Sequence, residues 1–97
     1  MITLINQLTV TGSEEEFRSI SAELNAFMSQ WPGYRSHTLL RSVREAGSYA
    51  EVAQWDDAAS HQAAVRTEEF QALIKRLAQV IAKPAPGLYE TVTAHQA

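Results

Sequence analysis

The chain has 97 residues, about the length of one compact domain, and its 45% hydrophobic and 20% charged residues are close to soluble globular averages. We therefore expect a single domain spanning residues 1–97. The net charge is −3, which argues against a nucleic-acid partner, because phosphate binding needs clustered positive charge. The chain contains no cysteine, which excludes disulfides, thiolate metal sites and cysteine nucleophiles. Without a signal-peptide pattern or an apolar run of roughly 18 residues, the sequence predicts a cytoplasmic protein with no membrane partner.

Residues 2–10 alternate in polarity, which predicts a strand, and Asn6 falls on its more apolar face. Ser13 and Glu16 then have the spacing of a capping box at the start of a helix. This helix is expected to end near Gln30, where a proline and a glycine follow. Its predicted apolar stripe consists of Phe17, Ile20, Leu24, Phe27 and Met28.

Residues 34–43 and 48–55 predict two strands joined by a short loop that ends in Gly47, as in a hairpin. A short helix is expected over residues 58–65, with either Asp56 or Asp57 as its cap.

Thr67 is expected to cap a further helix, which the proline-rich segment 83–87 would break. A last strand is predicted over residues 88–95. The predicted apolar stripe of this helix consists of Phe70, Leu73, Ile74, Leu77 and Ile81.

The predicted order is strand, helix, strand, strand, helix, strand. That order indicates an α+β fold of the ferredoxin-like, split βαβ type, with an antiparallel sheet and helices on one face. The other face of the sheet would then need cover, and a homodimer that stacks two sheets face to face would provide it.

The three histidines, His37, His61 and His95, show no metal-ligand spacing. Each is expected to be a surface or half-buried residue, and no metal site is predicted. The familiar nucleophile-elbow, P-loop and dinucleotide motifs are also absent from the sequence.

Polar groups on the inner strand faces are the remaining candidates for chemistry. Alternation places Glu51 and Trp55 on the same strand face as Tyr49, and Asn6 on the helix-facing side of the first strand. One interpretation is structural: Asn6 as a hydrogen-bonded core amide, Glu51 as a solvent-facing charge and Trp55 as core. The alternative interpretation places Asn6, Glu51 and Trp55 around one pocket between sheet and helices.

The order and spacing of several segments resemble the antibiotic biosynthesis monooxygenase family over nearly the whole chain. The family consists of small dimeric α+β barrels, and the likeness is greatest to cofactor-independent monooxygenases of aromatic polyketide pathways. The segments that carry the resemblance are Leu4–Val10, Pro32–Tyr34, His37–Arg41, Ser48–Tyr49 leading to Trp55, and Glu69–Phe70.

The resemblance implies catalytic roles for an asparagine on the first strand and a tryptophan at the end of the third, which Asn6 and Trp55 match. A second asparagine of that group is replaced here by Glu51. Related haem-degrading enzymes use a histidine and a tryptophan where this chain has Ile74 and Ala64, so we expect neither haem nor another cofactor.

The expected function is oxidation of an electron-rich aromatic substrate, such as an anthrone, naphthol or quinol, by dioxygen without metal or flavin. Asn6 would stabilise the developing oxyanion, Trp55 would donate its N–H or stack on the rings, and Glu51 would act as general base. The expected substrate-binding residues are Tyr49, Phe27, Phe70 and Leu73. Two alternatives stay open: a non-oxidative polyketide cyclase, and a non-catalytic dimer that binds small ligands or serves a stress response.

Overall fold

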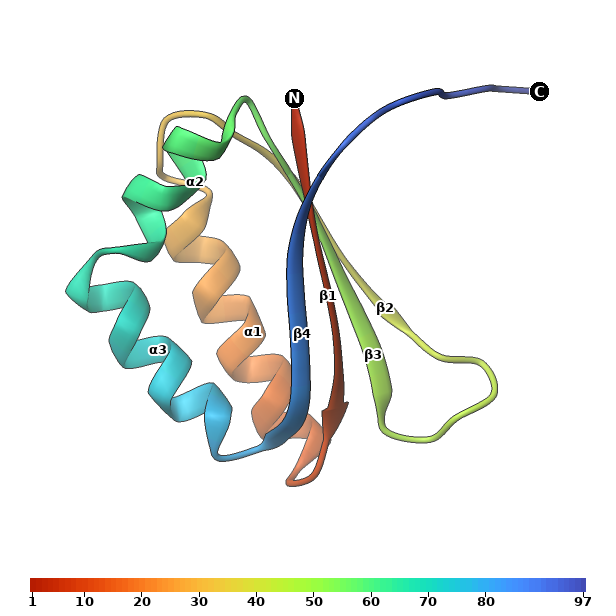
Figure 1. Cartoon of the computed structure of the whole chain (residues 1–97). Coiled ribbons are helices and arrows are strands. Elements are labelled where there is room, and N and C mark those ends of the chain that lie inside the picture. The colour runs from red at the N-terminus through yellow and green to blue at the C-terminus, as the bar shows by residue number, and fades with distance from the viewer.

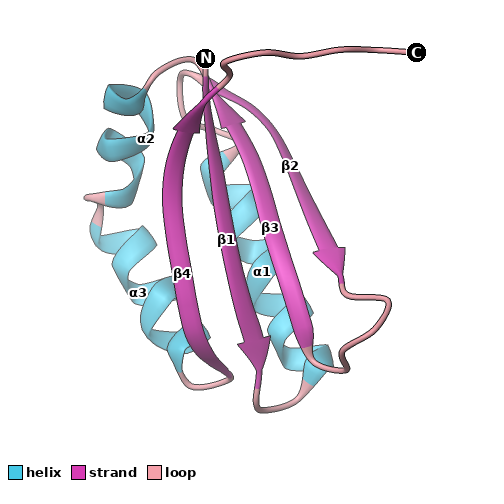
Figure 2. Ribbon diagram, turned by 45° about the vertical axis from the view of Figure 1, so that its right-hand side comes forward, coloured by secondary structure: helices cyan, strands magenta, loops and turns pink.

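A computed structural model describes all 97 residues and contains a four-stranded antiparallel sheet with strand order β2-β3-β1-β4. The three helices lie on one face of this sheet, and no element covers the other face (Figures 1 and 2). This arrangement confirms the predicted α+β, ferredoxin-like fold. The elements in chain order are β1 (Ile2–Val10), α1 (Glu14–Met28), β2 (Tyr34–Arg41), β3 (Ser48–Trp55), α2 (Ala58–Val65), α3 (Glu68–Ala78) and β4 (Ile81–Glu90).

Each helix begins at a side chain that accepts a hydrogen bond from a free backbone N–H of the first turn. The oxygens of Ser13, Asp57 and Thr67 accept from the N–H groups three residues further on, at 3.1, 2.8 and 3.2 Å. These contacts satisfy donors that have no partner within the helix. The three predicted caps are therefore confirmed.

The C-terminal part of the chain differs from the prediction. Helix α3 ends at Ala78, and β4 begins at Ile81, so the expected strand over residues 88–95 starts seven residues too late and extends too far. The reason is that β4 is an edge strand, where prolines are tolerated because one row of N–H groups has no strand partner. Pro84 and Pro86 therefore lie inside β4 rather than in a breaking loop.

Strand pairing determines which inner-face side chains are neighbours. In β1 and β3, Asn6 lies directly opposite Glu51, and Ile2 lies opposite Trp55. On its other side, Asn6 lies opposite Pro86 of β4. Asn6 and Glu51 thus meet in the middle of the sheet, and Trp55 lies at the end of β3.

The core consists of two clusters of buried apolar side chains. The larger cluster joins α1 and α3 to the part of the sheet where β1 ends and β3 begins. It contains Leu8, Phe17, Ile20, Leu24, Tyr49, Leu77 and Val80. The smaller contains Ala53, Trp55 and Ala64, and it attaches α2 to the end of β3. None of the three helices has the length and apolar character of a membrane span.

Candidate active site

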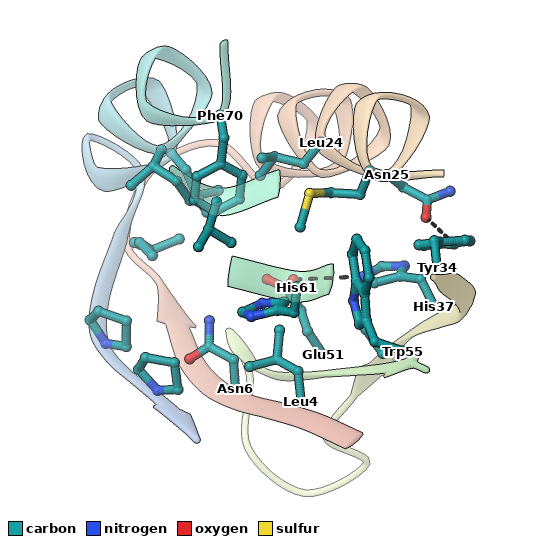
Figure 3. Close-up of a pocket in the computed structure, with 18 of the residues that line it drawn as sticks. Leu4, Asn6, Leu24, Asn25, Tyr34, His37, Glu51, Trp55, His61 and Phe70 are labelled. Atoms are coloured by element: carbon teal, nitrogen blue, oxygen red, sulfur yellow. Dashed lines mark hydrogen bonds and ion pairs between the residues drawn. The ribbon is translucent and has the colours of Figure 1, made fainter. Parts of the chain in front are cut away.

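A cavity of about 480 Å³ lies between the inner face of the sheet and the three helices. Apolar side chains from α1, α3 and β4 form much of its wall, while the polar groups come mainly from the strands and from α2 (Figure 3). A volume of this size is typical of pockets that enclose a small organic ligand. The polar or polar-tipped lining residues are Asn6, Asn25, Tyr34, His37, Glu51, Trp55 and His61.

The Asn6 amide is held in one orientation by the neighbouring edge strand. The backbone N–H of Ala85 donates a hydrogen bond to Asn6 Oδ1, with an N···O distance of 3.0 Å. An N–H can donate only to the amide oxygen, so this contact identifies which end of the amide is which. The NH₂ group of Asn6 is left to point into the cavity, as Figure 3 shows. Asn6 therefore presents hydrogen-bond donors to a ligand.

Glu51 extends from β3 into the same cavity and approaches a histidine on β2. Its Oε2 atom lies 3.6 Å from Nε2 of His37, and the two side chains are only 16% and 18% exposed. At that separation the contact is electrostatic rather than a hydrogen bond, and it is strongest when His37 is protonated. The carboxylate is thus available to accept a proton or a hydrogen bond from a ligand.

Trp55 forms the end wall of the cavity and packs between two other rings. It is 1% exposed and lies edge-on to Tyr34 and His61, with ring centroids 5.6 and 5.5 Å apart. Such perpendicular arrangements suit the quadrupoles of aromatic rings and fix the position of the indole.

Tyr34 is tied to helix α1 through its hydroxyl group. The hydroxyl donates a hydrogen bond to Asn25 Oδ1 at 2.6 Å, which joins β2 to α1 at the rim of the cavity. Burial raises the pKa of Tyr34, so the phenol stays protonated and keeps donating this bond at neutral pH.

His61 of α2 is half-buried, and its ring projects into the cavity from the helix side (Figure 3). Burial lowers the pKa of His61, which keeps the imidazole neutral at pH 7. Its Nδ1 is the only buried side-chain nitrogen or oxygen in the chain that lacks a hydrogen-bond partner. No group of three histidine or carboxylate side chains is arranged to hold a metal ion.

The structure brings together the three residues expected to do chemistry, since Asn6, Glu51 and Trp55 all line the cavity. This is the arrangement of the second interpretation, in which the three share one pocket.

Of the four expected substrate-binding residues, Phe70 lines the cavity and three do not. Tyr49 packs on Phe17 and its hydroxyl donates to Glu14, so it belongs to the core. Phe27 packs against Trp31 outside the cavity, and Leu73 packs against the larger core cluster. Alternation along a strand, or the apolar stripe of a helix, predicts the face on which each of these residues lies. Neither pattern predicts how far the residue lies from the cavity.

Two lining residues, His37 and His61, were not expected at the site. His37 lies on the inner face of β2 opposite Ala53, which strand alternation alone could have indicated. The alanines of helix α2 are distributed around its axis, so the helix has no preferred apolar face. No periodic pattern therefore indicates which way His61 points.

Comparison with known proteins places this site in a family context. The family model described as antibiotic biosynthesis monooxygenase matches residues 1–76. Deoxynogalonate monooxygenase of Streptomyces nogalater is 41% identical over 56 residues, which is 58% of this chain. The match spans about half of that relative's length, 48%.

Solved structures give the same relationship over nearly the whole length. SnoaB, a cofactor-independent oxygenase from Streptomyces nogalater, superposes with a TM-score of 0.87 at 32% identity, covering 99% of this chain and 94% of SnoaB. A Caulobacter crescentus protein described as an antibiotic biosynthesis monooxygenase superposes with a TM-score of 0.85 at 21% identity, covering 95% and 90%. The match to the Caulobacter crescentus protein shows that the two chains share a fold.

Proposed function

Because this chain belongs to the antibiotic biosynthesis monooxygenase family, we propose that it is a cofactor-independent monooxygenase that oxidises an electron-rich, polyketide-like aromatic with dioxygen. The description of SnoaB as a cofactor-independent oxygenase supports this proposal. So does the cavity, whose volume of about 480 Å³ suits a substrate of several fused rings.

A substrate of this class supplies the electrons itself. Once an anthrone or phenol is deprotonated, its anion can transfer an electron to dioxygen, and the two radicals then combine at carbon. The protein must accept the proton, stabilise the anion and exclude bulk water. These tasks need acid–base and hydrogen-bonding side chains rather than a redox group.

The observation that carries the proposal is the fixed orientation of Asn6. Because the Ala85 N–H occupies the amide oxygen at 3.0 Å, the Asn6 NH₂ is positioned in advance to donate to an oxyanion. A donor that needs no reorientation stabilises developing charge more than one that must turn toward it.

Glu51 and Trp55 would act on the same substrate from the adjoining strand. Glu51 lies opposite Asn6 in the sheet, so the proton acceptor and the oxyanion donor would meet the same end of the ligand. Trp55 would stack on the rings or donate its indole N–H, while Phe70 would contribute apolar contact from α3.

We propose in addition that the protein is a homodimer formed by the sheet face that the helices leave uncovered. The outward side chains there include Ile5 of β1 and Val52 of β3, which lie opposite each other. Leu40 and Tyr89 are 49% and 56% exposed near its two edges. Stacking two such faces would remove this apolar surface from water.

Isotopically labelled dioxygen tests the reaction. The protein is incubated with anthrone, and we expect one labelled oxygen atom in each quinone formed. Ring closure and loss of water from an uncyclised poly-β-ketone, with no label gained, would instead indicate a cyclase. Binding of anthrone in a thermal-shift titration with no product above the protein-free control would indicate a non-catalytic binding protein. Either of these two results would overturn the proposal.

A further inference from the structure

The oxidation of a CH₂ carbon to a carbonyl releases two protons, and the cavity holds a proton acceptor besides Glu51. That acceptor is His61, on the helix side of the cavity, across from the strand that carries Glu51. The surroundings of the imidazole determine whether it can exchange protons with a ligand.

The surroundings of the ring leave only one nitrogen free for this role. Nδ1 is buried and has no hydrogen-bond partner, so a ligand cannot reach it. Burial lowers the pKa of His61, which favours the neutral imidazole. Nε2 is not among the buried atoms without a partner, and in the tautomer that carries the proton on Nδ1 its lone pair is available to the cavity.

We propose that His61 is a second proton-transferring residue of the site, acting through Nε2 when the oxygenated intermediate collapses. This inference rests on the proposed monooxygenase function and adds a residue to it. Glu51 takes the first proton from the CH₂ carbon and returns it to the peroxide oxygen after dioxygen has added.

In the collapse step, the hydroperoxide loses water and a carbonyl group forms. Nε2 of His61 removes the remaining proton from the carbon that bears the hydroperoxide, the C–H electron pair becomes the second C–O bond, and the O–O bond breaks. Hydroxide leaves and takes the proton from His61 to become water. In sum, one CH₂ group and one dioxygen give one carbonyl group and one water, and dioxygen is the oxidant.

The desolvated environment of His61 suits a base that must give back its proton in the same turnover. Its imidazolium has a lowered pKa because it is desolvated, and therefore gives up its proton readily to hydroxide. The other titratable groups lining the cavity are Glu51 on β3 and both Tyr34 and His37 on β2. The lining parts of α1, α3, β1 and β4 contribute none.

The experiment compares the wild-type protein with His61→Gln and measures dioxygen consumed, quinone formed and hydrogen peroxide released from anthrone. We expect His61→Gln to lower the rate of quinone formation by about 10²-fold. Dioxygen uptake should fall less, so that peroxide-level intermediates or hydrogen peroxide accumulate. His95→Gln, in the exposed C-terminal segment, is the matched control and should behave as wild type.

Two further measurements distinguish proton transfer from a packing role against Trp55. Added imidazole should restore quinone formation to His61→Ala. The wild-type rate of collapse should fall as the pH drops through the lowered pKa of His61, and this fall should be absent from His61→Gln and present in His95→Gln.

The inference is overturned if the folded His61→Gln protein keeps the wild-type ratio of quinone to dioxygen and the wild-type pH profile. It is also overturned if imidazole fails to rescue a folded His61→Ala protein. Turnover by the wild-type protein is scored separately, so a failure of the proposed function itself would show as no quinone from any variant.

Discussion

At the level of single residues, the site depends on which atoms of its polar side chains already have partners within the chain. Asn6 has its donors directed into the cavity because a backbone group of β4 occupies its oxygen. Glu51 stays in reach of a ligand because its nearest ionisable neighbour, His37, is 3.6 Å away rather than hydrogen-bonded. Chemistry here would follow from hydrogen-bond direction and desolvation.

Asn6→Asp separates the donor function of Asn6 from its structural contact. The aspartate can still accept the Ala85 N–H, but it presents a second oxygen instead of an NH₂ group to the cavity. We expect kcat for anthrone oxidation to fall by about 10²-fold, as for other losses of an oxyanion donor, with little change in the melting temperature. Steady-state kinetics and thermal unfolding measure the two effects, and full activity in the variant would remove Asn6 from the mechanism.

The meeting of Asn6, Glu51 and Trp55 was predictable from alternation along two strands, because period two fixes the face of each side chain. Whether a side chain on that face lines the cavity or lies in the core was not predictable in the same way. Tyr49 shares the face of Glu51 yet lies in the core, since its ring packs on Phe17. His61 was missed because its helix shows no amphipathic pattern.

At the level of helices and strands, the sheet, α1 and α3 form most of the cavity wall, and α2 closes one end of it. Phe17 of α1 is fully buried in the larger core cluster. Replacing such a ring by a methyl group leaves a cavity that the surrounding structure cannot fill completely.

We therefore expect Phe17→Ala to lower the free energy of unfolding by about 3–5 kcal/mol. Val43→Ala is the control, because Val43 is 98% exposed and its truncation should change stability by less than about 0.5 kcal/mol. Urea denaturation measures both. A loss of stability in the control as large as that in Phe17→Ala would contradict the assignment of the core.

Helix α2, which carries His61, begins at the carboxylate of Asp57. The Ser60 N–H donates to this carboxylate at 2.8 Å and lowers the pKa of Asp57 below its usual value. A carboxyl with a lowered folded pKa stabilises the fold above its unfolded pKa, about 4, and this stabilisation is lost as pH falls through the folded value.

Asp57→Ala should accordingly reduce the melting temperature at pH 7, and the difference from wild type should shrink toward pH 2. Asp57→Asn keeps a capping oxygen and should lose less at pH 7. Thermal unfolding followed by circular dichroism across this pH range checks the trend. A difference that grows as the pH falls would contradict the cap.

The boundaries of the elements show where sequence patterns stop being informative. The caps and the hairpin follow from local chemistry, and the structure confirms them. The start of β4 was missed because prolines usually end regular structure, whereas an edge strand tolerates them. Edge position is a property of the whole sheet, so Pro84 and Pro86 could not reveal it locally.

At the scale of the whole molecule, all helices lie on one side of the sheet and the opposite face is open (Figure 1). That asymmetry motivates the proposed homodimer. The resemblance of the chain to the antibiotic biosynthesis monooxygenase family was evident from the order of its segments. The family match over residues 1–76 confirms it. The cytoplasmic location stays a prediction.

Val52→Lys tests the dimer, because Val52 points outward from β3 at the centre of the open face, opposite Ile5. We expect light scattering to give twice the chain mass for wild type and a shift toward the monomer mass for Val52→Lys, since a buried lysine in an apolar interface is costly. Val43→Lys, in the exposed hairpin loop, should remain dimeric. A monomeric wild-type protein at micromolar concentration would contradict the proposal.

The proposed activity of this chain is oxidation of an aromatic substrate with dioxygen and without a redox cofactor. The most direct measurement is dioxygen uptake by protein freed of flavin and treated with a chelator, with anthrone as substrate and quinone formation followed in parallel. We predict one dioxygen consumed for each quinone formed, at a rate well above the protein-free reaction. Uptake that appears only when flavin or a metal ion is added back would contradict it.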